Sequence, residues 1–428
     1  MKIGLVTACY KPVVNGVTQM VALYQKYLTD LGLDVTIFTL GEPGPEGDEP
    51  SVVRSPAIPL ADTGYYFGFR YSRHAQQLLR EMDILHCHHL VMSMELASRY
   101  SNAPIVYTNH TRYDLYASSV FSLAQTTSDA MMRQFWPQFT DYCDTVIAPS
   151  NGLRHIMQEF GVRRPIAVIP NGIELDNYWS PPAPFSKRHF GFDETDVLGV
   201  YVGRLSAEKR LPQLLQQFAL ALDVRPELRL LIVGDGPERT ALEQYVWSHG
   251  LSDSVRFAGS VPSQDVPNFL APADFFVTAS VSEVHPLTVI EAMAVGLPIA
   301  AVFSPGIADT VVNQQTGYLV HSGSGLAGAL VGLASSAAVR DQMGAAAKTA
   351  SRHFDIRQTV ALTVALYEKL LVQTSERRYR PLANWQESLA EGLRPVTEPF
   401  SRFWRDQYLN LIQPPGDARQ HKEREQGG

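Results

Sequence analysis

Two cations lie five residues apart in the segment 203–209 (Gly-Arg-Leu-Ser-Ala-Glu-Lys), directly after an apolar stretch that predicts a buried strand. An arginine offers a planar fork to two phosphate oxygens, whereas a lysine supplies a compact point charge. Arg204 and Lys209 would therefore suit a diphosphate placed near a helix N-terminus. The alternative is that both are ordinary solvated loop charges, and the pair alone does not decide between the two.

Two acids, Glu283 and Glu291, are separated by eight positions. We expect Glu283 in a turn and Glu291 on a helix that begins near Pro286, about 12 Å apart at the helical rise of 1.5 Å per residue. The backbone amides between them, including those of Leu287 and Thr288, can donate to anionic oxygens. This layout suits a nucleotide-diphosphate sugar. In the purely structural alternative, Glu283 is solvated and Glu291 stabilises the helix dipole.

Small glycine turns follow several predicted strands, at the sheet edge where open α/β sheets bind ligands. Examples are the turn with Asn15 and Gly16 after the first strand and the turn that starts at Gly234. Neither half begins with the GxGxxG turn of dinucleotide-binding units, and there is no GxxxxGK[ST] phosphate loop, so a nicotinamide dehydrogenase is disfavoured.

Apolar strand patterns alternate with helical patterns along most of the chain, which is typical of parallel sheets built from βαβ units. The first half predicts strands at 3–9, 35–40, 84–88, 105–109, 145–148 and 166–169, and the second half at 197–202, 228–233, 255–258, 275–279, 299–303 and 318–320. The expected fold class is α/β, with two tandem, doubly wound, Rossmann-like domains.

The domain limits follow from breaks in this pattern. A break follows the sequence Pro-Asn-Gly at 170–172, and the stretch 179–192 is rich in proline without periodicity. We predict a first Rossmann-like domain at 1–170, a second at 171–350, C-terminal helices packing back on the body at 351–413 and a disordered tail at 414–428. Aromatic residues between Phe400 and Leu411 recur at helical spacing, and this helix could instead lie in a membrane interface.

Composition limits the function classes. The formal charge of −7 argues against a nucleic-acid partner, and three widely spaced cysteines exclude a disulfide scaffold. No stretch approaches the roughly 18 apolar residues of a spanning helix. We read the apolar start as a buried strand rather than a signal peptide, and expect a cytoplasmic protein that can contact the inner membrane face peripherally.

The combined motifs resemble the retaining family-four glycosyltransferases. Glu283 and Glu291 form the E-x7-E pattern of that family, and the segments 15–17, 109–111, 169–172, 203–209 and 233–237 match it in order and spacing. The resemblance covers roughly residues 1–370 and implies the B-type fold, in which two Rossmann-like domains face a cleft. It implies that the domain at 1–170 is the acceptor-binding domain and the domain at 171–350 the nucleotide-sugar-binding domain. In overall pattern the segment around Tyr107–Tyr116 looks like that of diacylglycerol glucosyltransferases and related glycolipid enzymes.

The resemblance implies how the nucleotide diphosphate would be held. Arg204 and Lys209 would neutralise the diphosphate and stabilise the leaving nucleotide. The amides of Leu287 and Thr288 would contact sugar or phosphate, and Gly16 would let the backbone approach the phosphates closely. The donor-binding set implied is Gly16, Arg204, Lys209, Gly234, Glu283, Pro286, Leu287, Thr288 and Glu291.

The resemblance also implies the remaining roles. Glu283 would bind sugar hydroxyls, Glu291 would bind the ribose, and His110 would lie against the sugar near the reacting carbon. The chain departs from the family at His285 and Pro286, where many members carry an aromatic or small residue followed by glycine, so the donor sugar stays open. The catalytic set implied is His110, Arg204, Lys209 and Glu283.

Glu283 and Glu291 are too far apart to be the carboxylate pair of a retaining hydrolase, which lies about 5 Å apart. The resemblance implies front-face transfer instead, in which the departing phosphate oxygen takes the proton of the acceptor. We expect no metal and no cofactor beyond the nucleotide sugar. His86, His88 and His89 surround Cys87, but alternate residues of a strand point to opposite faces, so at most His86 and His88 share a side, and we do not predict a zinc site.

The sequence thus predicts a hexose transfer from a nucleotide-diphosphate sugar, UDP-glucose or GDP-mannose, to a hydroxyl of a lipid or glycan. An aromatic and methionine-rich segment after His110 could form an acyl-binding wall or simply be core; it contains Phe121, Met131, Met132, Phe135 and Trp136. Two alternatives remain open. One is a B-fold sugar-nucleotide epimerase, and the other is a nucleotide-sugar-binding protein that has lost catalysis.

Overall fold

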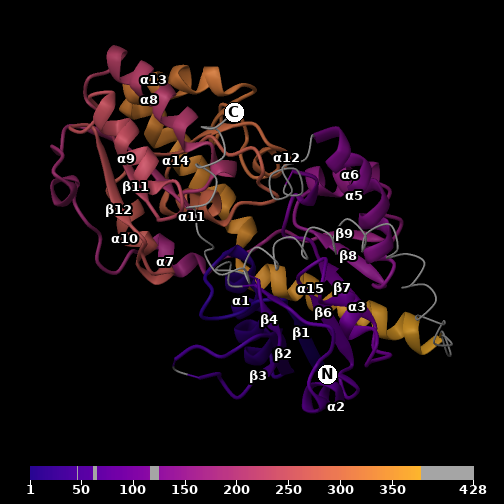
Figure 1. The fold of residues 1–428 in the computed structure, drawn as a ribbon. Coiled ribbons are helices and arrows are strands. Elements are labelled where there is room, and N and C mark those ends of the chain that lie inside the picture. The colour runs from indigo at the N-terminus through magenta and orange to yellow at the C-terminus, as the bar shows by residue number, and fades with distance from the viewer. Residues whose placement is uncertain (46, 61–64, 116–124, 377–428) are drawn as a thin grey trace, which may run out of the picture. The chain divides into compact units, whose positions relative to one another are not determined.

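The computed structural model describes residues 1–45, 47–60, 65–115 and 125–376 (Figure 1). Its main compact unit, Met1–Leu371, contains two parallel β-sheets. The predicted tail and the aromatic helix at 400–411 lie outside the described residues. No helix of the described residues is both long and apolar enough to cross a membrane.

The first sheet has the strand order β3-β2-β1-β6-β7-β8-β9, all parallel. Its strands are β1 (Lys2–Val6), β2 (Asp34–Leu40), β3 (Val52–Ser55), β6 (Ile84–Cys87), β7 (Ile105–Thr108), β8 (Thr145–Ala148) and β9 (Ile166–Val168). A short antiparallel pair, β4 (Ile58–Pro59) with β5 (Tyr66–Phe67), stands beside it. The helices of this half are α1 (Gly16–Asp30), α2 (Arg73–Leu79), α3 (Met94–Ala97), α5 (Gln125–Thr140) and α6 (Asn151–Glu159).

The second sheet has the order β12-β11-β10-β13-β14-β15 and is also parallel throughout. Its strands are β10 (Val197–Val202), β11 (Leu228–Val233), β12 (Val255–Gly259), β13 (Phe275–Thr278), β14 (Ile299–Val302) and β15 (Gly317–Val320). Its α-helices are α7 (Leu175–Trp179), α8 (Leu211–Val224), α9 (Arg239–Ser248), α10 (Val266–Leu270), α11 (Leu287–Val295), α12 (Pro305–Ala308), α13 (Leu326–Ser335) and α14 (Ala337–Ser351). Single 3₁₀ turns lie at Lys187–Phe190, Ala207–Lys209, Ser263–Asp265, Gly323–Gly325 and Arg352–Phe354.

Each predicted strand is present, and the predicted fold of two Rossmann-like parallel sheets is confirmed. The parallel edge strand β3 and the β4–β5 pair were not predicted. Strand β3, Val-Val-Arg-Ser, has only two apolar residues and is mostly half-buried, so it lacks the apolar run that marks the other short strands. It becomes a strand by pairing with β2, with Val52 opposite Ile37 and Ser55 opposite Leu40. This pairing is a tertiary contact that the local sequence does not show.

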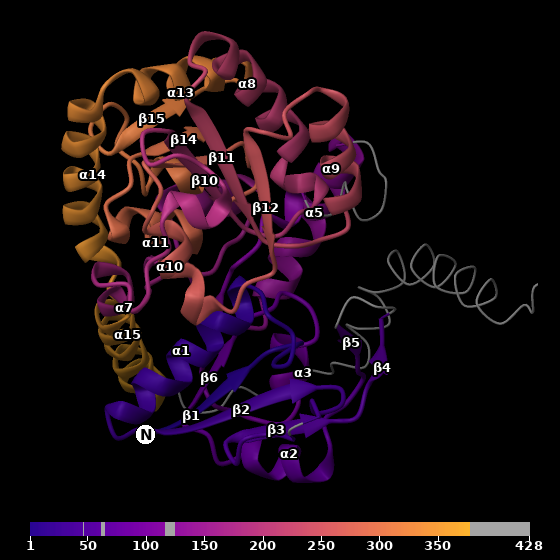
Figure 2. The ribbon, with the colours of Figure 1, turned by 90° about the vertical axis from the view of Figure 1, so that its left-hand side faces the viewer.

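Helices cover both faces of each sheet, as Figure 2 shows from the side. Buried residues of α1 and of α15 (Ile356–Glu376), the last helix of the described residues, share one core with β1, and this core includes Tyr24, Ile356 and Tyr367. The chain thus returns from the second sheet to pack on the first. Central strands are buried along their whole length, as in β10, which fits sheets covered on both faces.

Candidate functional site

The predicted phosphate turn of the second sheet follows β10. The chain leaves the strand at Gly203 and makes the 3₁₀ turn Ala207–Lys209. The Nζ atom of Lys209 lies 2.7 Å from Oε1 of Glu283, with side chains 23% and 18% exposed. Arg204 is exposed. The structure therefore brings Lys209 and Glu283 of the predicted catalytic set into direct contact, with Arg204 at the start of the same turn.

The Lys209–Glu283 pair is charged because each partner stabilises the other. Burial alone would raise the pKa of the Glu283 carboxyl. The attraction of the Lys209 ammonium together with its hydrogen bond is the larger effect, and it holds the pKa of Glu283 below its ordinary value. Burial likewise opposes the charge of Lys209, and the carboxylate of Glu283 outweighs it, so the pKa of Lys209 is raised. At neutral pH the two side chains therefore form an ion pair, with each charge stabilised by the other.

The loop that carries Glu283 is held by the first half of the chain. The Ser150 hydroxyl donates to the Val284 carbonyl at 2.6 Å, and the Asn171 amide donates to the His285 carbonyl at 3.0 Å. Gly306 lets the loop lie this close, because a Cβ atom there would be 2.3 Å from the Val284 carbonyl carbon. Both halves of the chain therefore fix the position of Glu283.

Helix α11 begins directly after this loop, with Pro286 as the N-cap residue and no side chain capping its first turn. The first amides of the helix, at Leu287 and Thr288, therefore have no side-chain acceptor among the described residues. A Cβ atom added to Gly16, the first residue of α1, would have its nearest neighbour at Leu287, 4.0 Å away. The predicted donor residues Gly16 and Leu287 are thus brought close together by the fold, with the Leu287 side chain beside the start of α1.

Glu291 lies on α11 and is 7% exposed. Burial raises the pKa of its carboxyl to about 7, and a hydrogen bond from the Tyr178 hydroxyl lowers the pKa only partly. Tyr178 comes from α7, and no sequence pattern indicates this contact because the two residues are more than a hundred positions apart. The ribose-binding role of Glu291 stays a prediction.

Gly234 has a specific packing role. Its φ is +136°, and a Cβ atom there would lie 1.9 Å from the Gly203 carbonyl oxygen. Glycine is therefore required so that the turns after β10 and β11 can touch. Its predicted contact with the donor remains a prediction.

His110 follows β7 at the carboxyl edge of the first sheet. Its Nε2 lies 3.0 Å from Nδ1 of His88, and the two rings are stacked at 17°. Burial lowers the pKa of His110 to about 3, and the pKa of His88 is also lowered, so both rings are neutral at pH 7. The first half thus contributes uncharged imidazoles where the second contributes an ion pair.

The histidine-rich end of β6 is arranged as the strand alternation predicts. The rings of His86 and His88 are 4.2 Å apart on one side of the sheet, while His89 lies with Thr7, whose Oγ1 is 3.1 Å from its Nδ1. Among the described residues, no group of three His, Cys, Asp or Glu side chains is placed to hold a metal ion.

The aromatic segment after His110 is in part core. Trp136 is fully buried and Met132 nearly so, and both belong to the core between β6, β7 and α5. Met131 packs against that core, while Phe121 lies outside the described residues. Trp136 and Met132 are therefore core residues rather than an exposed acyl-binding wall.

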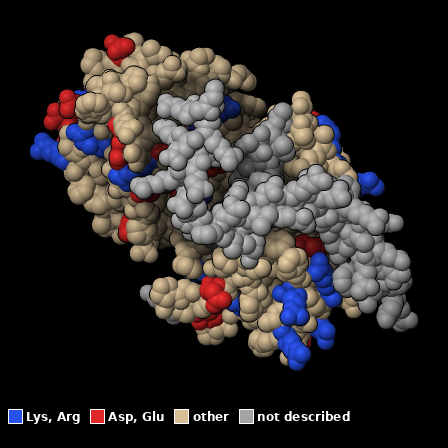
Figure 3. Space-filling model, viewed as in Figure 1, with Lys and Arg blue, Asp and Glu red and all other residues tan. Residues whose placement is uncertain are grey.

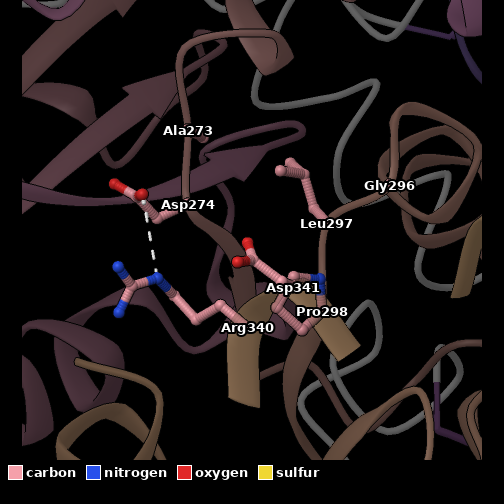
Figure 4. Close-up of a pocket in the computed structure, with 7 residues that line it drawn as sticks. All are labelled: Ala273, Asp274, Gly296, Leu297, Pro298, Arg340 and Asp341. Atoms are coloured by element: carbon pink, nitrogen blue, oxygen red, sulfur yellow. Dashed lines mark ion pairs between the residues drawn. The ribbon is translucent and has the colours of Figure 1, made fainter. Parts of the chain in front are cut away.

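Two cavities lie away from these residues. One, about 280 Å³, opens at the amino ends of β13 and β14, where Asp274 pairs with Arg340 (Figure 4). Asp274 also accepts from Lys187 and from the Leu198 amide, so this carboxylate ties the connecting segment to the sheet. The second cavity, about 460 Å³, lies between α10 and the segment near Phe185.

The fold is that of two Rossmann-like parallel sheets in one chain, and the Lys209–Glu283 pair lies beside the start of α11. Comparison with known proteins agrees. Residues 14–177 match the model of the family described as Glycosyltransferase Family 4, and residues 183–350 match the model described as Glycosyl transferases group 1. Together the two models cover most of the chain and both describe glycosyltransferases, so the chain is a glycosyltransferase that resembles family four, as its motifs predicted.

Similar proteins act on several acceptors. The chain is 28% identical to an alpha-monoglucosyldiacylglycerol synthase of Streptococcus pneumoniae, over 77% of this chain and 78% of that protein. It is 24% identical to a D-inositol 3-phosphate glycosyltransferase of Kribbella flavida, over 82% and 90% of the two chains.

Solved structures share the fold. The sucrose-phosphate synthase of Thermosynechococcus elongatus superposes with a TM-score of 0.70 at 20% identity, covering 87% of this chain and 99% of that one. HepE of Anabaena, solved with UDP and glucose, superposes with a TM-score of 0.67 at 22% identity, covering 85% and 99%.

Proposed function

We propose that this glycosyltransferase moves a hexose from a nucleotide-diphosphate sugar to a lipid hydroxyl, with retention of configuration at the sugar carbon. The observation that carries the proposal is the start of α11. Its first amides have no side-chain cap, the Leu287 side chain lies 4.0 Å from the Cβ position of Gly16, and Glu283 of the Lys209–Glu283 pair lies in the preceding loop. Uncapped helix amides and nearby cations favour a diphosphate.

In the proposed reaction the bond between the sugar C1 and the diphosphate oxygen breaks, and the acceptor oxygen bonds to C1 from the same face. The acceptor proton passes to the departing phosphate oxygen, and the nucleoside diphosphate leaves. Lys209, Arg204 and the α11 amides would stabilise the charge that grows on the diphosphate. When the donor binds, Glu283 would leave its ion pair with Lys209 and accept hydrogen bonds from sugar hydroxyls, while Lys209 would bind the diphosphate.

No divalent cation is required in this proposal, because two cations and helix amides supply the positive charge. Activity should persist in excess EDTA. A loss of activity in EDTA that is restored by Mg²⁺ or Mn²⁺ would contradict this part.

For the donor we propose UDP-glucose, with GDP-mannose as the alternative, and for the acceptor a diacylglycerol. Support comes from the similar proteins that are named alpha-monoglucosyldiacylglycerol synthases. The test is incubation of each donor with diacylglycerol in mixed micelles, followed by NMR of the product. An α-linked glycolipid is expected. Turnover of the donor to an isomeric sugar nucleotide without acceptor would favour an epimerase, and binding of the donor without turnover would favour a silent binding protein.

We also propose that the protein is cytoplasmic and contacts an anionic membrane face through the region of α2. Lys and Arg side chains gather over this region (Figure 3), and Arg70, Arg73 and Arg80 are exposed there. Phe69 is 69% exposed beside them, and its carbonyl accepts from Arg99. An exposed aromatic ring among cations suits an interface with anionic lipid.

Vesicle binding tests the membrane proposal. The protein should sediment with vesicles containing phosphatidylglycerol and less with pure phosphatidylcholine vesicles. The F69D/R73E variant should lose several-fold in binding, whereas W247D, which alters an exposed tryptophan on α9, should not. Equal sedimentation of F69D/R73E and the unaltered protein would contradict the proposal.

A further inference from the structure

His88 is the partner of His110 and lies in the interior. It is 1% exposed, and its Nδ1 lies 3.0 Å from Nε2 of His110. Since both rings are neutral, each carries one N–H and one acceptor nitrogen. Exactly one of the two facing nitrogens must therefore be protonated for this hydrogen bond to form. Which one is protonated decides what the other end of His110 offers.

The surroundings of Nε2, the second ring nitrogen of His88, indicate which of the two facing nitrogens is protonated. This Nε2 is buried and has no hydrogen-bond partner among the described residues. If Nε2 carried the proton, a donor would be left unpaired in the interior, and buried unpaired N–H groups are rarer than under-satisfied acceptors. The less costly state puts the proton on Nδ1 of His88, which then donates to Nε2 of His110. The single proton of His110 must then be on Nδ1.

The surroundings hold His88 in this orientation. The ring centroid of His86 lies 4.2 Å from that of His88, and the ring centroid of Tyr24 lies 5.6 Å from it. Both rings are tilted relative to the His88 ring. His86 is itself fixed at both nitrogens, by Thr108 Oγ1 at 2.6 Å and by the Tyr367 hydroxyl of α15 at 2.6 Å. Neither neighbour forms a hydrogen bond with His88 in the described structure. His110 is therefore the hydrogen-bond partner of the His88 ring among the described residues.

We propose that His88 is a positioning residue that fixes His110 as the Nδ1–H tautomer, so that His110 presents a hydrogen-bond donor, and not a base, toward the donor sugar. This inference rests on the proposed function for its catalytic meaning. A donor can hold a sugar or phosphate oxygen, whereas an acceptor nitrogen could compete for the proton that the departing phosphate takes. His88 acts only through His110 and does not touch substrate.

The tautomer can be measured without substrate. In protein labelled with ¹⁵N-histidine, two-bond ¹H–¹⁵N correlation spectra separate protonated from unprotonated ring nitrogens, and an H110Q variant identifies the signals of His110. We expect Nδ1 of His110 to be protonated and Nε2 not, from pH 6 to 8. Protonation at Nε2 would overturn the inference, whatever the enzyme's substrate proves to be.

Kinetics of two variants test the positioning role. H88N keeps an amide N–H near the place of Nδ1 and should retain the His110 tautomer and most of the turnover. H88L removes the donor and should mix the tautomers and lower kcat by about ten- to a hundredfold, with little change in donor KM. Equal kcat for H88L and H88N would overturn the inference. H249N, at an exposed histidine, is the matched control. Absence of turnover in the unaltered protein would instead contradict the proposed function.

Discussion

The candidate site residues of the two halves of the chain differ in their electrostatics. On the second sheet, Lys209 and Glu283 form a partly exposed ion pair that remains charged at neutral pH. On the first sheet, His88 and His110 are neutral rings paired with each other. The charged side suits an anionic leaving group. The neutral side can orient a sugar without competing for that charge, and it cannot itself neutralise a diphosphate.

This comparison predicts that removing the charge of Lys209, on the second sheet, lowers turnover more than any change in the histidine pair. K209A should lower turnover by about a hundred- to a thousandfold, because it removes charge stabilisation of the leaving diphosphate and leaves Glu283 without its partner. The measurement is kcat/KM with the donor that proves active. K2A, which breaks the exposed Lys2–Glu81 pair, is the control and should leave turnover unchanged. A K209A enzyme with full turnover and a normal circular dichroism spectrum would remove the diphosphate role.

A second prediction concerns pH and Glu291. Its pKa of about 7 lies above the unfolded value near 4.5, so the folded protein binds more protons between these values. Its contribution to stability is therefore full below pH 4.5 and is lost as pH rises through 7, by roughly 3 kcal/mol at most. In urea titrations from pH 5 to 8, E291Q should lose less stability than the unaltered protein. Parallel pH profiles for the two proteins would contradict the burial argument.

The smallest effect expected comes from the loop between the two sides. G306A would place a methyl group against the Val284 carbonyl and should cost about 1–3 kcal/mol in unfolding free energy, while displacing Glu283. G328A, on α13 where a Cβ meets no neighbour within 4 Å, is the matched control and should be neutral or stabilising. If G306A proves as stable and active as G328A, the loop is not held as described.

The sequence predicted most strands because they are apolar runs, and it predicted Glu283 in a turn and Glu291 on a helix because Pro286 marks the start of that helix. It could not predict contacts that depend on tertiary packing. The Tyr178–Glu291 bond, the Ser150 bond to Val284 and the clash that requires glycine at 234 all join segments far apart in the chain. For His88, alternation predicted the side of the sheet it shares with His86, but not its bond to His110.

Calorimetric titration of UDP and GDP into the unaltered protein and into K209A tests the central claim most directly. The account predicts that one nucleotide binds with a dissociation constant of about 1–100 μM and that K209A weakens it by at least about tenfold. Binding of neither nucleotide, or equal binding by K209A, would contradict a diphosphate site at the start of α11.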